Sequence, residues 1–255
     1  MLGTRLIACL VVKNGIAVQS IGFSKYLPVC RVEIAVEYLS RWGIDEIVIV
    51  DIDASRAGRS FDLEMAQAAA GAGFVPLTLG GGIKSVAEIR MLLKQGADKI
   101  CLNNSARLNP GLISEAAKVF GSQCIVVGID SFAIKNNYKV HLYTGDPDQS
   151  KESSKTTNSW ISEVQDRGAG EIVLNCMNQD GVREGYDLGQ LREMRNLCKV
   201  PLIASGGAGK MSDFYDVFNQ ADVSGSLAAS VFHKKIIDIS DLKKYLQKKQ
   251  IEVRL

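Results

Sequence analysis

The sequence predicts an α/β fold, a single (β/α)8 TIM barrel with an internal half-barrel repeat. Short apolar runs alternate eight times with segments of helical length, no Pro-, Gly- or Ser-rich linker divides the 255 residues, and one strand–glycine-turn pattern recurs half a chain apart. Eight strand–helix units in about 250 residues are typical of this barrel. A doubly wound sheet also alternates strand and helix, but it does not explain eight units with a repeat. We therefore expect residues 1–255 to form one barrel domain.

The expected strands are rich in Ile, Val, Leu and Cys, as parallel strands covered by helices usually are. They span 5–10, 46–51, 75–79, 99–103, 124–130, 172–176, 201–205 and 223–229. The expected helices lie between them, at 30–42, 61–71, 85–96, 110–120, 156–167, 187–197, 210–219 and 234–248. Ser85 followed by Glu88 predicts a capping box, and Gly43, Gly96 and Gly168 lie just past helix ends.

The repeat joins a glycine turn to a later strand end in each half of the chain. The first copy runs from the Gly80-Gly81-Gly82 turn to Asn103, and the second runs from Gly206-Gly207 to Ala228 with the same spacing between its last glycine and its end. Glycine turns after strands expose backbone N–H groups that can bind phosphate oxygens. We expect two phosphate sites facing each other across the mouth, although turn formation alone also explains glycine.

Composition excludes several classes of function. The net charge is +2 and the charged residues are interleaved, so we expect neither a nucleic-acid partner nor a membrane partner. The six cysteines form no C-x-x-C pair, which favours free thiols in a cytoplasmic protein over disulfides or a metal site. No motif predicts a cofactor. The expected ligand is a phosphorylated small molecule.

One long connection, residues 131–155, follows the fifth expected strand. Its segment Tyr138–Tyr143 alternates like one arm of a hairpin, and Thr144-Gly145-Asp146-Pro147 reads as a turn. In a barrel this loop belongs to the C-terminal face, where active-site lids lie. A surface insertion without regular structure is the alternative.

Polar residues at the strand ends are the candidates for chemistry at the mouth. These are Asp51, Asp53, Thr78, Asn103, Asp130, Asn175, Asn178 and Ser205. Asp130 is the best candidate for a general acid or base, and a hydrogen bond to a loop is its alternative role. Acid–base chemistry usually needs a second group across the mouth. The first strand should supply it, but Cys9-Leu10-Val11-Val12 contains no such group.

Several motifs together resemble one family over essentially the whole chain. They are Pro76–Ile83, Gly96–Lys99, Phe120–Val127, Asp180-Gly181 with Gly185-Tyr186-Asp187, Ile203–Gly209 and Ala228–His233. The chain resembles the cyclase subunit of imidazole glycerol phosphate synthase, the histidine-pathway enzyme that works with a glutaminase. The resemblance implies a barrel that receives ammonia through its core and uses it on a bis-phosphorylated ribulosyl nucleotide. The products would be imidazole glycerol phosphate and an aminoimidazole carboxamide ribotide.

The resemblance also assigns roles to residues at the mouth. The matching phosphate positions are Gly82, Asn103, Asp180, Gly181, Gly207 and Ser230. Of the catalytic aspartate pair in the family, Asp130 matches the second, and Val11 stands at the first. The substrate-contacting lysine of the family is replaced by Gln19, and Asn175 replaces a threonine. These substitutions imply a weakened cyclase reaction, since loss of one acid–base group costs about 10²–10⁴ in rate.

At the opposite end of the barrel, the resemblance implies an ammonia gate. Its four charged positions match Arg5, Glu46, Lys99 and Glu171, and Asp98 matches a position that helps to dock the glutaminase. A solvated ring of salt bridges is the alternative explanation for these charges.

An intact gate beside an altered first strand resembles divergent relatives of the cyclase. These act with a glutaminase-like partner and a sugar amidotransferase in surface-polysaccharide (O-antigen, lipopolysaccharide) biosynthesis, where ammonia is needed for an acetamidino sugar. The main expectation is therefore a heterodimer with a glutaminase, in which the barrel is an ammonia channel. The alternative is an active lyase-type cyclase of histidine biosynthesis, and a weaker one is an isomerase of the same barrel superfamily.

Overall fold

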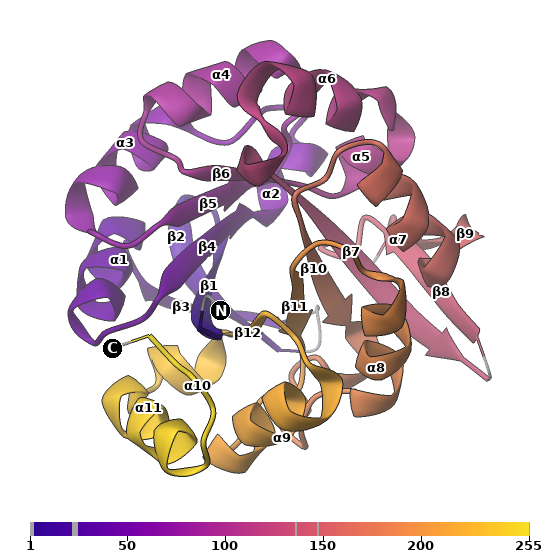
Figure 1. The fold of residues 1–255 in the computed structure, drawn as a ribbon. Coiled ribbons are helices and arrows are strands. Elements are labelled where there is room, and N and C mark those ends of the chain that lie inside the picture. Colours follow the sequence, from indigo (N-terminus) through magenta and orange to yellow (C-terminus); the bar gives the residue numbers. More distant parts are fainter. Residues whose placement is uncertain (1–2, 22–24, 136, 147, 255) are drawn as a thin grey trace.

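The computed structural model describes residues 3–21, 25–135, 137–146 and 148–254, and it shows a closed barrel (Figure 1). Within these residues eight parallel strands form the ring, because β1 pairs with both β4 and β12, and β7 pairs with β10. The barrel strands in order are β1 (Arg5–Lys13), β4 (Glu46–Asp51), β5 (Leu77–Gly80), β6 (Lys99–Leu102), β7 (Ile125–Ile134), β10 (Glu171–Cys176), β11 (Leu202–Ser205) and β12 (Gly225–Ala228). The predicted TIM barrel is confirmed.

A helix covers each gap between strands on the outside of the ring (Figure 1). These helices are α1 (Val32–Arg41), α3 (Leu63–Ala72), α4 (Val86–Lys94), α6 (Gly111–Phe120), α7 (Thr157–Asp166), α8 (Leu188–Leu197), α9 (Met211–Ala221) and α11 (Ile239–Lys248). Ser85 and Glu88 form the predicted capping box of α4. Gly43, Gly96 and Gly168 have positive φ past the ends of α1, α4 and α7, as the predicted helix ends require.

Some elements were not predicted from the sequence. After β1 the chain forms an antiparallel hairpin of β2 (Ile16–Ile21) and β3 (Lys25–Cys30), and short helices α2 (Ile52–Arg56), α5 (Asn104–Leu108) and α10 (Ser230–His233) follow three barrel strands. Cys30 therefore ends a strand, and the helix expected from residue 30 begins at Val32. Two 3-10 turns, η1 (Ser122–Cys124) and η2 (Met177–Gln179), complete the elements assigned in the described residues.

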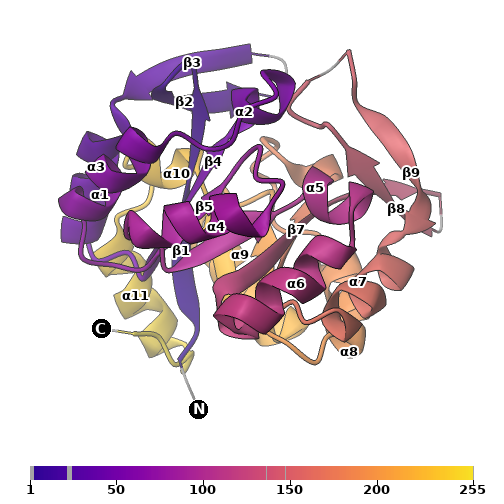
Figure 2. The ribbon, with the colours of Figure 1, turned by 90° about the horizontal axis from the view of Figure 1, so that it is seen from above.

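The long connection after the fifth strand is an ordered extension of the barrel. β7 continues past Asp130 to Ile134 and pairs with β8 (Asn137–Leu142), which pairs with β9 (Lys151–Thr156). The predicted hairpin arm is thus confirmed; Pro147 of the expected turn lies outside the described residues. Figure 2 shows this extension and the β2–β3 hairpin at the same end of the barrel, opposite to the N-terminus.

Two separate groups of apolar side chains stabilise the barrel. The larger group fills the space between strands and helices and includes the fully buried Trp160 and Phe214. The smaller group, Ile7, Val48, Ile203 and Leu227, packs inside the ring of strands. The inner lining between the two ends of the barrel is therefore largely apolar. All six cysteines are free thiols, and none of the described helices is long and apolar enough to cross a membrane.

Candidate active site

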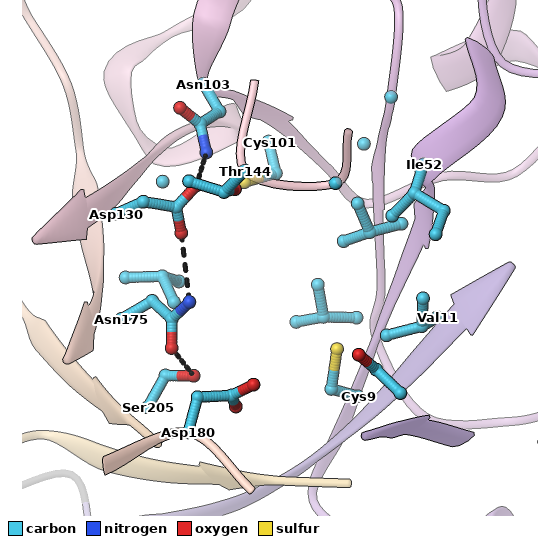
Figure 3. A pocket seen from close by; sticks show the side chains of 18 of the residues that line it. Cys9, Val11, Ile52, Cys101, Asn103, Asp130, Thr144, Asn175, Asp180 and Ser205 are labelled. Carbon is cyan, nitrogen blue, oxygen red and sulfur yellow. Dashed lines mark hydrogen bonds between the residues drawn. The ribbon is translucent and has the colours of Figure 1, made fainter. Parts of the chain in front are cut away.

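A cavity of about 620 Å³ opens at the carboxyl ends of the barrel strands. Side chains from β1, β4, β6, β7, β10 and β11 line it, together with both glycine turns of the repeat. A volume of this size suits a small-molecule ligand, and this end of a TIM barrel is where active sites lie. Cys9, Val11, Asp130 and Asp180 all contribute to its wall (Figure 3).

Asp130 is held by three hydrogen-bond donors from three segments. Asn103 Nδ2 donates to Oδ2 at 2.9 Å, Thr144 Oγ1 donates to the same oxygen at 2.6 Å, and Asn175 Nδ2 donates to Oδ1 at 3.0 Å. Asn175 in turn accepts from Ser205 Oγ at 3.3 Å, so its amide has a fixed orientation (Figure 3). The structure thus places Asp130 in the cavity in a fixed orientation, with one hydrogen bond from a loop residue, and its role as a general acid or base stays a prediction.

Asp180 follows η2 and lies in the same cavity (Figure 3). Burial, together with the nearby charge of Asp130, raises the pKa of its carboxyl group to about 6. None of the described residues donates a hydrogen bond to this carboxyl group. The carboxyl group of Asp180 is close enough to Cys9 for its charge to raise the pKa of that thiol. The expected role of Asp180 in phosphate binding stays a prediction.

The wall formed by the first strand is apolar. Val11 and Ile52 lie on the side of the cavity opposite to Asp130 (Figure 3). Gln19 on β2 also lines the cavity, but it brings no charge. Burial raises the pKa of the Cys9 and Cys101 thiols to about 12, so both are neutral near pH 7. The acid or base expected across the mouth is absent from β1 itself.

The two glycine turns are similar in that their glycines all have positive φ. Gly81 and Gly82 have φ of 121° and 69°, and Gly206 and Gly207 have φ of 98° and 105°. The residues that precede α5 and α10 also match, because Asn103 has φ −125° and ψ −93°, and Ala229 has φ −112° and ψ −82°. The structural repeat therefore ends at Ala229, one residue later than the predicted Ala228. We call the first set, Gly80–Gly82 with Asn103, the first cup.

The second cup comprises Gly206, Gly207, Gly181 and Ser230, and all four line the cavity. It also contains Arg183, whose Nη2 donates to Ser230 Oγ at 3.0 Å. Sequence reasoning missed Arg183, although a cation shortly after Asp180-Gly181 is a usable signal for an anion site. Both cups border one cavity, so the predicted phosphate residues are brought together as two groups. Phosphate binding itself stays a prediction.

Replacing Gly82 by Ala is expected to close the first cup and to destabilise the fold. A Cβ atom there would lie 2.0 Å from Arg59 O, and φ is 69°. Gly58→Ala is a matched control, because Gly58 also has φ of 69° and open space around it. We expect Gly82→Ala to lower the free energy of unfolding by about 1–3 kcal/mol more than Gly58→Ala does. Urea unfolding measures this, and equal losses would contradict the role assigned to the clash.

The segment 143–146, between β8 and β9, lies over one side of the cavity. Thr144 contacts Asp130, Tyr143 N donates to Asn104 Oδ1 at 2.9 Å, and Gly145 packs against Ile52. Tyr26 on β3 donates through its hydroxyl to Gly145 O at 3.5 Å. The extension expected as a possible lid therefore contacts both Asp130 and the β2–β3 hairpin. Thr144 was missed as a site residue, because its role depends on how the hairpin folds back.

The charged ring at the other end of the barrel is compact and largely buried. Arg5 binds Glu46 and Glu171 at 2.8 Å each, and Lys99 Nζ lies 3.0 Å from Glu46 and 3.3 Å from Glu171. Only Lys99 is appreciably exposed, at 16%. Burial favours neutral forms, yet Arg5 and Lys99 lower the pKa of Glu46, so this carboxylate stays ionised. We call these four residues the gate.

The other sequence candidates bind partners other than Asp130, although Asp51 also lines the cavity. Asp98 is exposed beside the gate, and its carboxylate accepts a hydrogen bond from Leu77 N. Asp53 pairs with Lys13, and Asn178 binds the backbone of Ala133. Asp51 caps α2, and it also pairs with Arg59 at 2.7 Å. Thr78 is buried within the barrel wall. Among the described residues no cluster of His, Cys, Asp and Glu could hold a metal ion.

Known proteins resemble this chain over its full length. The family model described as "Histidine biosynthesis protein" matches residues 5–238. The protein named imidazole glycerol phosphate synthase subunit HisF from Pseudoalteromonas translucida is 48% identical, with all of both chains covered. Those of the same name from Tolumonas auensis and Xanthomonas euvesicatoria are each 50% identical, covering all of this chain and 100% and 99% of their own. This chain therefore belongs to the histidine biosynthesis protein family and, within it, to the HisF-like cyclase subunits of imidazole glycerol phosphate synthase.

Proposed function

We propose that this chain is the barrel subunit of an imidazole glycerol phosphate synthase that works with a glutaminase. Ammonia released by the glutaminase enters at the gate, crosses the barrel, and reacts with a ligand that carries two phosphates at the mouth. The observation that carries this proposal is the placement of the gate and of the two-cup cavity at opposite ends of one barrel. The names of the relatives support the same reaction.

Two features, the charge balance of the gate and the apolar lining beyond it, support a passage for neutral ammonia. Its two cations and two anions alternate around the ring, so their charges compensate one another without ordered counter-ions. Beyond it the lining by Ile7, Val48 and Ile203 is apolar. Ammonia is uncharged and small, whereas an ammonium ion would have to lose its hydration in this lining. The glutaminase partner would dock beside the gate, where Asp98 and Lys99 are accessible.

A second candidate function follows from Val11 and Gln19, which offer neither an acid nor a cation on the first-strand side. In it, the barrel activates a glutaminase and passes ammonia to another enzyme, such as a sugar amidotransferase of surface-polysaccharide biosynthesis. The relatives named above give no support to a sugar acceptor, since their names refer to imidazole glycerol phosphate synthase. The first candidate is therefore preferred.

One assay separates the two candidates. The ribulosyl nucleotide is mixed with an ammonium salt and the purified chain, and its absorbance is followed. We expect turnover by the unmodified protein, with no more than about a tenfold gain in the Val11→Asp, Gln19→Lys double variant. No turnover by the unmodified protein, together with turnover by the double variant, would instead favour the ammonia-passing function.

A further inference from the structure

We propose that Asp180 replaces the acid that strand β1 lacks, so that Asp130 and Asp180 form the acid–base pair of this cavity. The proposal rests on the proposed function, because it assigns residues to that reaction. It is specific to a chain with Val11 on the first strand, where a carboxyl group would otherwise stand.

The two carboxyl groups differ in their hydrogen bonding. Asp130 accepts hydrogen bonds from Asn103, Thr144 and Asn175 at 2.6–3.0 Å. Asp180 accepts no hydrogen bond from the described residues, although it is partly buried in the same cavity. Two carboxyl groups whose surroundings differ in this way divide into one base and one acid. Asp130 is the base and Asp180 the acid.

Asp180 also lies near the first strand. Asp180 lies close enough to Cys9 to affect its pKa, and Cys9 is two residues before Val11 on β1. Residues two apart on a strand face the same side, and both of these line the cavity. Figure 3 shows the carboxyl group of Asp180 in the cavity, beyond Asn175 and Ser205 from Asp130. The acid therefore comes from the loop after β10 but lies near the face of β1 that lacks one.

The surroundings of Asp180 also affect its protonation state. Burial, followed by the charge of Asp130, raises the pKa of Asp180 to about 6. The titratable groups that face it are Asp130 on β7, Cys9 on β1 and Tyr26 on β3. The thiol and the phenol are neutral near pH 6, since their ordinary pKa values lie well above 6 and burial raises both. Asp180 thus keeps a proton in a range where an ordinary aspartate has lost it.

These two groups can serve the attack of ammonia on a ketone of the ligand. The nitrogen forms a bond to the carbonyl carbon while one C–O bond of the double bond breaks. Asp130 accepts a proton from that nitrogen, and Asp180 gives its proton to the oxygen. The carbinolamine that results has gained one ammonia and no net proton. Return of the proton from Asp130 to Asp180 restores both groups.

The experiment compares Asp180→Asn with a double variant that moves the acid to the first strand. With ammonium salt and the ribulosyl nucleotide, we expect Asp180→Asn to lower kcat by about 10²–10⁴. Adding Val11→Asp to Asp180→Asn should recover at least about tenfold of this loss. For the unmodified protein at a fixed concentration of free ammonia, kcat/KM should fall as the pH rises through about 6, because the acid must be protonated.

Controls separate chemistry from folding and from the proposed function itself. Asp166→Asn, at an exposed carboxylate on α7, should leave kcat unchanged. Asp180→Glu should keep more activity than Asp180→Asn if both variants unfold at similar urea concentrations.

Carboxyl ¹³C NMR of the free protein should show Asp180 titrating near 6, and at a lower pH in Asp130→Asn. Titration of Asp180 at an ordinary value, or unchanged turnover in Asp180→Asn, would overturn the proposal. Failure of the proposed function differs, because the unmodified protein itself would then show no turnover.

Discussion

Replacing Asp130 by Asn is expected to lower kcat/KM of the ammonium-driven reaction by about 10²–10⁴. The amide cannot accept a proton from the attacking nitrogen. In the unmodified protein, Oδ2 of Asp130 accepts from Asn103 and Thr144, and Oδ1 accepts from Asn175. The amide group of the Asp130→Asn variant would therefore point an N–H at a hydrogen-bond donor in either orientation. The measurement is steady-state turnover of the ribulosyl nucleotide with saturating ammonium salt.

Asn has nearly the same shape as Asp, so phosphate binding by Asp130→Asn distinguishes loss of the base from damage to the cups. Binding of inorganic phosphate at the second cup, followed by ³¹P NMR, should change by less than about threefold in Asp130→Asn, because none of the side chains that donate to Asp130 belongs to that cup. Asn178→Asp serves as the matched control, since Asn178 contacts the backbone of Ala133 outside the cavity. A loss of less than tenfold in kcat/KM of Asp130→Asn would contradict its role as the base.

Replacing Arg5 by Met is expected to lower the free energy of unfolding by about 3 kcal/mol. Arg5 is the partner of both Glu46 and Glu171, and its removal leaves Lys99 as the remaining gate cation for two buried carboxylates. Removing one member of a buried ion pair typically costs about 3–5 kcal/mol, and Lys99 offsets part of this. Urea unfolding at pH 7 measures the difference.

The control and the pH dependence make this prediction specific. Arg41→Met removes an exposed pair with Glu37 and should cost no more than about 0.5 kcal/mol. Because the pKa of Glu46 is lowered in the folded protein, its contribution to stability is full above the ordinary glutamate pKa and is lost as the pH falls below about 4. In Arg5→Met the pKa of Glu46 is lowered less, so this loss of stability at low pH should be smaller. Equal effects of Arg5→Met and Arg41→Met would contradict the buried gate.

The barrel was predictable because its signals are local and repeated. Apolar strand runs, the Ser85 capping box and the glycines past helix ends each specify one element, and the half-chain repeat relates the elements to one another. The β2–β3 hairpin was not predictable in this way. β3 is largely exposed, and it contains Pro28 and few residues that alternate in burial. Its strand conformation depends on pairing with β2, which is a tertiary contact.

The candidate site was predictable where a residue ends a barrel strand. Asp130, Asn103 and Asn175 lie at such ends, and the closed ring brings them within hydrogen-bond distance. Thr144 and Arg183 lie on loops whose direction the sequence pattern does not specify. The raised pKa of Asp180 was not predictable either. It depends on burial and on the distance to Asp130, and no sequence motif specifies these.

The most direct test of ammonia delivery through the barrel uses the complex with a glutaminase subunit of an imidazole glycerol phosphate synthase. The complex is given glutamine, the ribulosyl nucleotide, and an excess of glutamate dehydrogenase with its substrates to consume any ammonia that reaches the solvent. We predict that glutamine-driven turnover of the nucleotide persists at nearly one product for each glutamine hydrolysed. Loss of product formation when the scavenger is added, with glutamine hydrolysis unchanged, would contradict passage from the gate to the mouth.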